Sequence, residues 1–133
     1  MIPVARLNIP PCPKPRMTRA DKWKKRQSVV KFFAFRDAVR QYKDSDVVKR
    51  SMYHAPNLEF ESFDIEFHVP MPKSWSNKKK IEMNGKPHQQ RPDLDNYLKA
   101  WKDSVYEEDA VVWRVKATKL WTDGTGHITV SFM

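Results

Sequence analysis

The chain has 133 residues, of which 40% are hydrophobic and 31% are charged. That length suffices to bury one core, and the composition excludes an intrinsically disordered chain. The longest apolar runs are a few residues, which excludes a membrane-spanning helix, and the single cysteine, Cys12, cannot form an internal disulfide. No secretory signal is visible, so an intracellular, cytoplasmic protein is expected.

The formal net charge is +9, which favours a polyanionic partner, with nucleic acid ahead of an anionic membrane. A surplus of positive charge that only keeps a small protein soluble is the alternative. The cations are clustered along the chain, and this clustering favours nucleic acid.

Residues 4–9 alternate in polarity, which predicts a short strand, and the prolines between Pro10 and Pro15 end it. A basic loop is predicted over residues 10–27. Its Trp23 either stacks on an unpaired base or folds onto the core. We assign these cations of the loop to DNA phosphates: Lys14, Arg16, Arg19, Lys22, Lys24, Lys25 and Arg26.

From Ser28, aromatic and apolar residues recur at three- and four-residue spacing. This pattern predicts an amphipathic helix that is capped by Ser28, buries its aromatic stripe in the core and frays by residues 43–46. The connection that follows is polar and carries no clear pattern.

Residues 58–69 predict a strand. Its apolar residues switch from even to odd positions near Ser62, so a bulge or turn is expected there. Asp64, Glu66 and His68 share its other face. They could be mistaken for a metal cluster, but alternating polar residues on the outer face of a sheet are the commoner arrangement.

Residues 74–83 predict a short basic helix that is capped by Ser74 or Ser76 and stopped at Gly85. The helix lies in a lysine-rich insert, residues 73–87. His88 follows and could ligate a metal or carry a proton, although a loop histidine more often does neither. We assign a second group of cations to DNA: Lys78, Lys79, Lys80 and Arg91.

Two carboxylates, Asp93 and Asp95, stand where a proline-led loop enters a helix. Lys99 follows one helical turn after Asp95. It could act in catalysis, or it could simply form an ion pair with Asp95. Asp95 can also cap the helix, a role that does not explain Asp93. The spacing predicts that the helix buries Leu94, Leu98, Trp101 and Val105.

Residues 110–121 predict a long strand in which apolar residues, Val111 and Trp113 among them, alternate with polar ones. Residues 123–126 predict a hairpin turn, and residues 127–133 predict a closing strand. The elements together predict an α/β (α+β) fold. We expect one domain over residues 1–133, in which a small mixed sheet of about four strands packs with two to three helices.

A second acidic group, Glu107 to Asp109, stands just before the predicted long strand. Mg²⁺ prefers oxygen ligands and keeps several waters, so Asp93, Asp95 and Asp109 suit it, with Mn²⁺ as a substitute. The absence of a Cys/His set argues against structural zinc. A metal bound there would polarise a phosphate and orient the attacking water, and Lys99 would neutralise charge in the transition state or on the leaving group.

The ensemble Asp93-Leu94-Asp95-Asn96, Lys99-Ala100, Asp103 and residues 105–112 resembles the RusA family of Holliday junction resolvases, which are known from bacteria and their prophages. This resemblance covers most of the chain, loosely outside these motifs. It implies a homodimer of small α/β subunits that acts as a Mg²⁺-dependent endonuclease and nicks two opposing strands of a four-way DNA junction symmetrically. The family's acidic triad and lysine fall on Asp93, Asp95, Asp109 and Lys99.

The chain departs from the family at two positions. Glu108 stands where the family often has aspartate, and we favour Asp109 as the ligand. Val111 replaces the usual glutamine, so any polar role is lost at that position.

Two other functions fit the residues: a non-catalytic nucleic-acid-binding module whose acids only cap and pair, and a metal-dependent nuclease acting on RNA or flaps.

Overall fold

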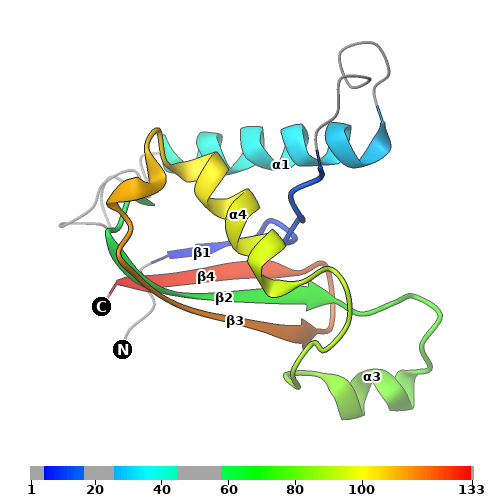
Figure 1. Cartoon of the computed structure of the whole chain (residues 1–133). Helices are drawn as coiled ribbons and strands as arrows, with labels where there is room; N and C mark the ends of the chain where they lie inside the picture. Colours follow the sequence, from blue (N-terminus) through cyan, green and yellow to red (C-terminus); the bar gives the residue numbers. More distant parts are fainter. Residues whose placement is uncertain (1–4, 17–25, 45–57, 133) are drawn as a thin grey trace.

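Two helices cover one face of a four-stranded sheet in the computed structural model of this chain (Figure 1). The structure describes residues 5–16, 26–44 and 58–132. It confirms the predicted α+β class, with a mixed sheet and three helices. In chain order the elements are β1 (Ala5–Leu7), α1 (Gln27–Lys43), β2 (Ser62–Pro70), α3 (Asn77–Met83), α4 (Leu94–Val105), the 3-10 turn η3 (Asp109–Val111), β3 (Arg114–Thr122) and β4 (His127–Phe132).

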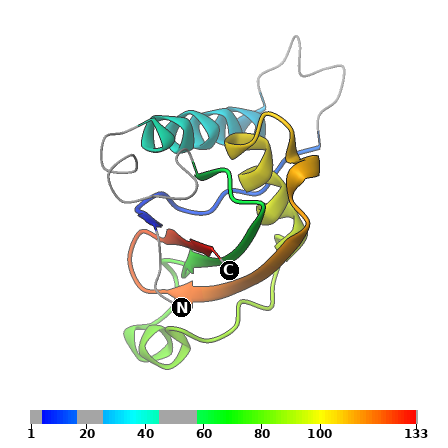
Figure 2. The same ribbon diagram turned by 90° about the vertical axis from the view of Figure 1, so that its left-hand side faces the viewer.

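The strand order of the sheet is β1-β4-β2-β3. β2 and β3 run parallel, whereas β4 is antiparallel to both of its neighbours, β1 and β2. Parallel neighbours need a connection that returns the chain to the same end of the sheet, and α4 makes this return across one face. α1 lies over the same face, and Figure 2 shows both helices on one side of the curved sheet.

β2 supplies the centre of the core. Its residues alternate between buried and half-buried, with Phe63, Ile65 and Phe67 fully inside. This confirms the predicted inward side of the strand. Leu58 is buried before the strand begins and has a left-handed φ of 64°, which confirms a turn ahead of Ser62.

α1 buries the predicted aromatic stripe, including Phe32, Phe35 and Val39. The predicted Ser28 cap is wrong, because the helix begins at Gln27, with Arg26 at the N-cap position and no side-chain capping bond. Packing of the apolar stripe against α4 and the core therefore holds the helix, rather than a cap. In the described part of the chain, no helix combines the length and apolarity that crossing a membrane requires.

The predicted long strand starts later than expected. The Glu108 side chain accepts a hydrogen bond from the Ala110 N–H at 3.1 Å, which caps η3. The Trp113 N–H then donates to the Glu61 carbonyl at 3.0 Å. The pairing of β3 with β2 begins at the next residue, with Arg114 opposite Ser62. Val111 and Trp113, predicted to belong to the strand, lie before it and are 48% and 71% exposed.

The connection over residues 123–126 is not a hairpin turn as predicted. β4 lies on the far side of β2 from β3, so the chain must pass over the end of β2. Gly126 makes this passage with φ +88°, and an added Cβ there would meet Pro70 Cδ at 2.9 Å and the His68 carbonyl oxygen at 3.0 Å. A side chain at position 126 would therefore push the connection away from β2.

Candidate active site

The amino end of α4 presents two exposed carboxylates. Asp93 occupies the N-cap position with φ −66° and ψ 153°, and Asp95 lies in the first turn. The alternative role of Asp95 as the N-cap residue is therefore wrong, although Asp95 does lie at the positive end of the helix dipole. The Asp93 side chain makes no capping bond, although its backbone carbonyl accepts from the Asn96 N–H at 3.1 Å. The helix dipole favours negative charge at this end.

Packing decides which side of α4 faces outward. Of the predicted stripe, Trp101 and Val105 are buried, whereas Leu94 and Leu98 are only half-buried. Tyr97 lies inside instead and stacks on Phe67 of β2 with ring centroids 5.5 Å apart, and its burial raises the pKa of the phenol to about 12. The remaining buried positions of the helix are Ala100 and Ser104.

A cationic hollow of about 450 Å³ opens beside the first turns of α4. Lys99 and Asn96 line it from the helix, and Lys14 and Arg16 line it from the chain after β1. The Lys14 N–H donates to the Asn96 carbonyl at 3.2 Å, which ties the two segments together. Two predicted phosphate-binding cations thus lie beside the predicted catalytic lysine.

Asp103 holds two of these cations. Its Oδ2 lies 3.3 Å from Lys14 Nζ and 3.9 Å from Lys99 Nζ. Lys14 also stands over the Phe32 ring, 4.1 Å from the centroid. Lys99 therefore pairs with Asp103, one turn after it, rather than with Asp95. Since Lys99 is exposed, this pair is weak and leaves the ammonium open to a phosphate.

Asp109 begins η3, which follows the carboxyl end of α4, so it lies at the opposite end of the helix from Asp93 and Asp95. Figure 1 shows this end of α4 turned away from α3. The helix has 12 residues, which corresponds to about 18 Å of length. Asp109 Oδ2 instead lies 3.8 Å from Lys102 Nζ. Across residues 5–16, 26–44 and 58–132, no three His, Cys, Asp or Glu side chains are grouped so that they could hold a metal ion. One chain in this conformation therefore does not gather the three predicted ligands.

Asp93 and Asp95 by themselves still suit Mg²⁺. This ion commonly takes one or two protein carboxylates and fills its octahedron with waters and substrate phosphate oxygens. Two exposed carboxylates at a helix start leave open space for such ligands.

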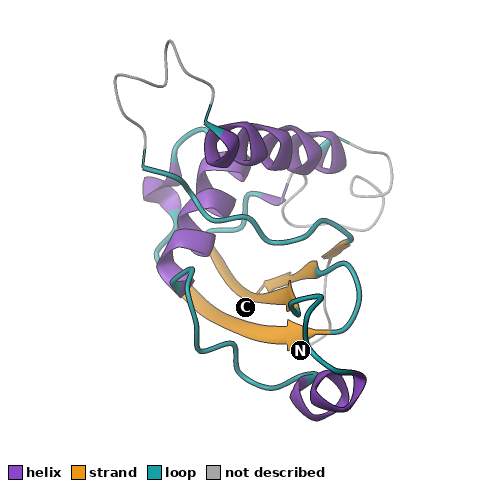
Figure 3. Ribbon diagram, turned by 90° about the vertical axis from the view of Figure 1, so that its right-hand side faces the viewer, coloured by secondary structure: helices purple, strands orange, loops and turns teal. Residues whose placement is uncertain are grey.

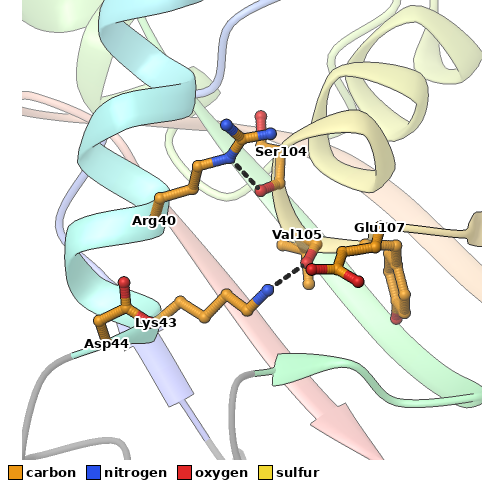
Figure 4. Close-up of a pocket in the computed structure, with 7 residues that line it drawn as sticks. Arg40, Lys43, Asp44, Ser104, Val105 and Glu107 are labelled. Carbon is orange, nitrogen blue, oxygen red and sulfur yellow. Dashed lines mark hydrogen bonds between the residues drawn. The ribbon is translucent and has the colours of Figure 1, made fainter.

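A second hollow, of about 380 Å³, lies at the carboxyl ends of α1 and α4 (Figure 4). Lys43 Nζ donates to the Val105 carbonyl at 2.7 Å, and Arg40 Nε donates to the Ser104 carbonyl at 3.3 Å. Cations that satisfy the last carbonyls of a helix stabilise its negative end. We therefore interpret this hollow as part of the packing of α4.

Of the remaining predicted DNA-binding cations, those that the structure describes fall at the same end of the molecule as the start of α4. Figure 3 looks onto this end, where α3 and the start of α4 face the viewer. α3 has the predicted Ser76 cap, and Lys79 stands over the Trp75 ring at 4.2 Å. Arg26 donates to the Arg16 carbonyl, which closes the base of the basic loop. The other described cations here are Lys78, Lys80 and Arg91; Arg19, Lys22, Trp23, Lys24 and Lys25 lie outside the described residues.

The polar face of β2 makes contacts within the sheet. Glu66 Oε1 lies 3.3 Å from His68 Nε2 and accepts from Thr129 Oγ1 at 3.2 Å. His68 stacks on His127 with ring centroids 4.0 Å apart. These contacts match the expected polar face of a sheet.

Lys119 contacts the loop before Asp93, although the motifs of the sequence did not point to it. It occupies a position of β3 with the same parity as Val115, Ala117 and the buried Trp121. Its Nζ donates to the carbonyls of Gln90 and Pro92, directly before Asp93. A lysine among apolar residues of one parity was the pattern that could have revealed it.

His88 lies in the loop before α4, but its side chain is buried in the core. It is 4% exposed, and its ring lies 4.3 Å from Trp121 and 6.4 Å from Tyr97. Burial, reinforced by the positive charge of Lys119, lowers its pKa from the ordinary 6.5.

We expect protein stability to fall as the pH drops below about 6.5, because the unfolded chain then binds a proton that the buried His88 ring resists. The free energy of unfolding, measured by urea titration from about pH 7.5 to about pH 5, should decline more in the wild type than in His88→Phe. His127, whose pKa burial also lowers, adds the same decline in the free energy of unfolding to both proteins. Equal declines would show that His88 does not carry the effect.

Comparison with known proteins identifies the family. The family model described as Endodeoxyribonuclease RusA matches residues 8–133. "Uncharacterized protein YqaN" of Bacillus subtilis (strain 168) is 36% identical over 70 residues, an alignment that covers 47% of this chain and 49% of YqaN. The match thus spans about half the length of that relative. Because the family model covers nearly the whole chain, this protein belongs to the RusA endodeoxyribonuclease family.

Proposed function

We propose that this protein is a homodimeric, Mg²⁺-dependent endodeoxyribonuclease that resolves four-way and related branched DNA by paired symmetric nicks, in DNA recombination and repair. The main support comes from the residues at the amino end of α4. There, the exposed residues Asp93 and Asp95 come just before Asn96, which lines a hollow together with Lys14, Arg16 and Lys99. Cations that bind phosphate beside acids that bind a metal form the arrangement that phosphodiester cleavage requires.

Each group has a proposed role. Asp93 and Asp95 hold Mg²⁺, or Mn²⁺ in its place, and the bound metal supplies polarisation of the phosphate and a more acidic water. Lys99 neutralises the charge that develops on the phosphate or the leaving oxygen. Asp109 is the proposed third ligand, and it can join the other two only from a second copy or after a movement of residues 106–113.

Binding to DNA is proposed to rest on phosphates and shape rather than on base sequence. The cations of the basic loop, Arg91 and the lysines of α3 supply the phosphate contacts, so affinity should fall steeply with salt. A two-fold junction offers two equivalent strands, which suits a dimer with two symmetric sites.

The test is incubation of the purified protein with a labelled synthetic four-way junction, with and without Mg²⁺. Paired nicks in opposing strands of the junction, and none in a linear duplex of the same sequence, are expected. Absence of nicks in Mg²⁺ and in Mn²⁺ would overturn the enzymatic proposal. Cleavage of RNA or flaps in preference to junctions would instead identify a different metal-dependent nuclease.

A non-catalytic nucleic-acid-binding module is the second candidate. It draws support from the ion pairs that already occupy two of the motif's acids, Asp103 with Lys14 and Asp109 with Lys102. It predicts that titration with Mg²⁺ detects no site and that Asp93→Asn changes nothing but net charge.

A further inference from the structure

The chain between α3 and α4 is held along the carboxyl half of β3. The Gly85 N–H donates to the Trp121 carbonyl and the Trp121 N–H donates to the Lys86 carbonyl, both at 2.9 Å. The His88 N–H donates to the Lys119 carbonyl at 3.1 Å. These backbone bonds fix residues 85–88, but the loop continues for four more residues before it reaches Asp93.

A side chain of β3 extends this attachment to the start of α4. Lys119 Nζ donates to the Gln90 carbonyl at 2.6 Å and to the Pro92 carbonyl at 2.8 Å. The Pro92 carbonyl belongs to the peptide unit that leads into Asp93. An ammonium has three donors, and two of them are thus directed at the loop rather than at solvent. Lys119 is also only half-buried, so a cation at this position could instead contact a phosphate.

We propose that Lys119 is a positioning residue for the metal-binding end of α4. It fixes the backbone on both sides of Arg91 and so sets where the carboxylates of Asp93 and Asp95 project. Such carboxylates must be held within a fraction of an ångström to bind a metal and act on a phosphate together. This inference rests on the proposed nuclease function, in which these two acids hold the metal.

The experiment compares two lysines of the same strand. Lys119→Met keeps the length of the side chain and removes its donors, whereas Lys116→Met removes the same charge from an exposed position. Single-turnover cleavage of a four-way junction in Mg²⁺ and junction affinity across a salt series are measured for both. We expect Lys119→Met to lower the cleavage rate of bound junction by about tenfold or more, as loss of an outer-shell partner does at metal sites. Its affinity and salt dependence should match those of Lys116→Met, and Lys119→Arg should recover part of the rate.

A second measurement needs neither DNA nor metal. The amides of Asn96 and Tyr97 donate to the Asp93 carbonyl, so their hydrogen exchange reports the order of the first turn of α4. Exchange at both amides should be faster in Lys119→Met and unchanged in Lys116→Met. If Lys119→Met does not fold, Lys119→Gln, which retains one donor group, carries the same comparison.

Two outcomes would overturn the inference. Equal cleavage rates in the two methionine variants would show that Lys119 does not position the acids. A loss of affinity in Lys119→Met far beyond that of Lys116→Met would show direct contact with phosphate. Should the wild type cleave no junction at all, the proposed function fails, and the exchange measurement still decides whether Lys119 orders the start of α4.

Discussion

Asp93→Asn is expected to abolish junction cleavage while junction binding persists or tightens. The variant removes a carboxylate that we propose binds the metal, and it also removes negative charge beside the DNA phosphates. Asparagine is as good an N-cap residue as aspartate, so α4 should form normally. Loss of an outer-shell partner alone costs about 10- to 100-fold at metal sites, so losing a direct ligand should cost more than about 100-fold.

The matched control for this variant is Asp123→Asn. Asp123 is exposed in the connection between β3 and β4, and its replacement makes the same change in net charge. Cleavage should remain at the wild-type rate in the control, and any tightening caused by net charge alone should appear in both variants. Wild-type cleavage by Asp93→Asn would contradict the proposed ligand role and favour the non-catalytic module.

Trp101→Ala is expected to remove about 3–5 kcal/mol from the free energy of unfolding. Trp101 is 0% exposed and lies where α4 packs in the core. The total free energy of unfolding of a domain of this size is about 5–15 kcal/mol, so the variant should be only marginally stable. Urea denaturation followed by circular dichroism measures the loss.

Trp113→Ala is the control for that prediction, because it is the same substitution at a position that is 71% exposed. Its free energy of unfolding should stay within about 0.5 kcal/mol of the wild type. Trp101→Phe should cost less than Trp101→Ala, because it keeps most of the apolar contact. Similar losses for Trp101→Ala and Trp113→Ala would show that the core does not depend on α4 as described.

Local pattern determined much of this protein. Alternation along β2 predicted its inward face, and the three- and four-residue spacing of α1 predicted its buried stripe. Gly85 predicted the end of α3, and of the two serines predicted as its cap, Ser74 and Ser76, the structure uses Ser76. These features depend on side chains only a few residues apart, which the sequence places relative to one another directly. The acidic motif was likewise recognisable, and it led to the family that the whole-chain comparison confirms.

Tertiary structure decided the rest. Whether β3 pairs with β4 depends on which side of β2 the last strand adds to the sheet. The residues of the connection between β3 and β4 do not determine that side. Chain order puts Asp109 after α4, but only the fold shows that the segment does not return to Asp93 and Asp95 and that Asp109 pairs with Lys102 instead. The contact of Lys119 with the loop before Asp93 joins residues that are 29 and 27 positions apart. Such contacts arise only when separate elements pack, so the sequence by itself identified the acids and the lysine of the candidate site, whereas the fold determined which of them lie together.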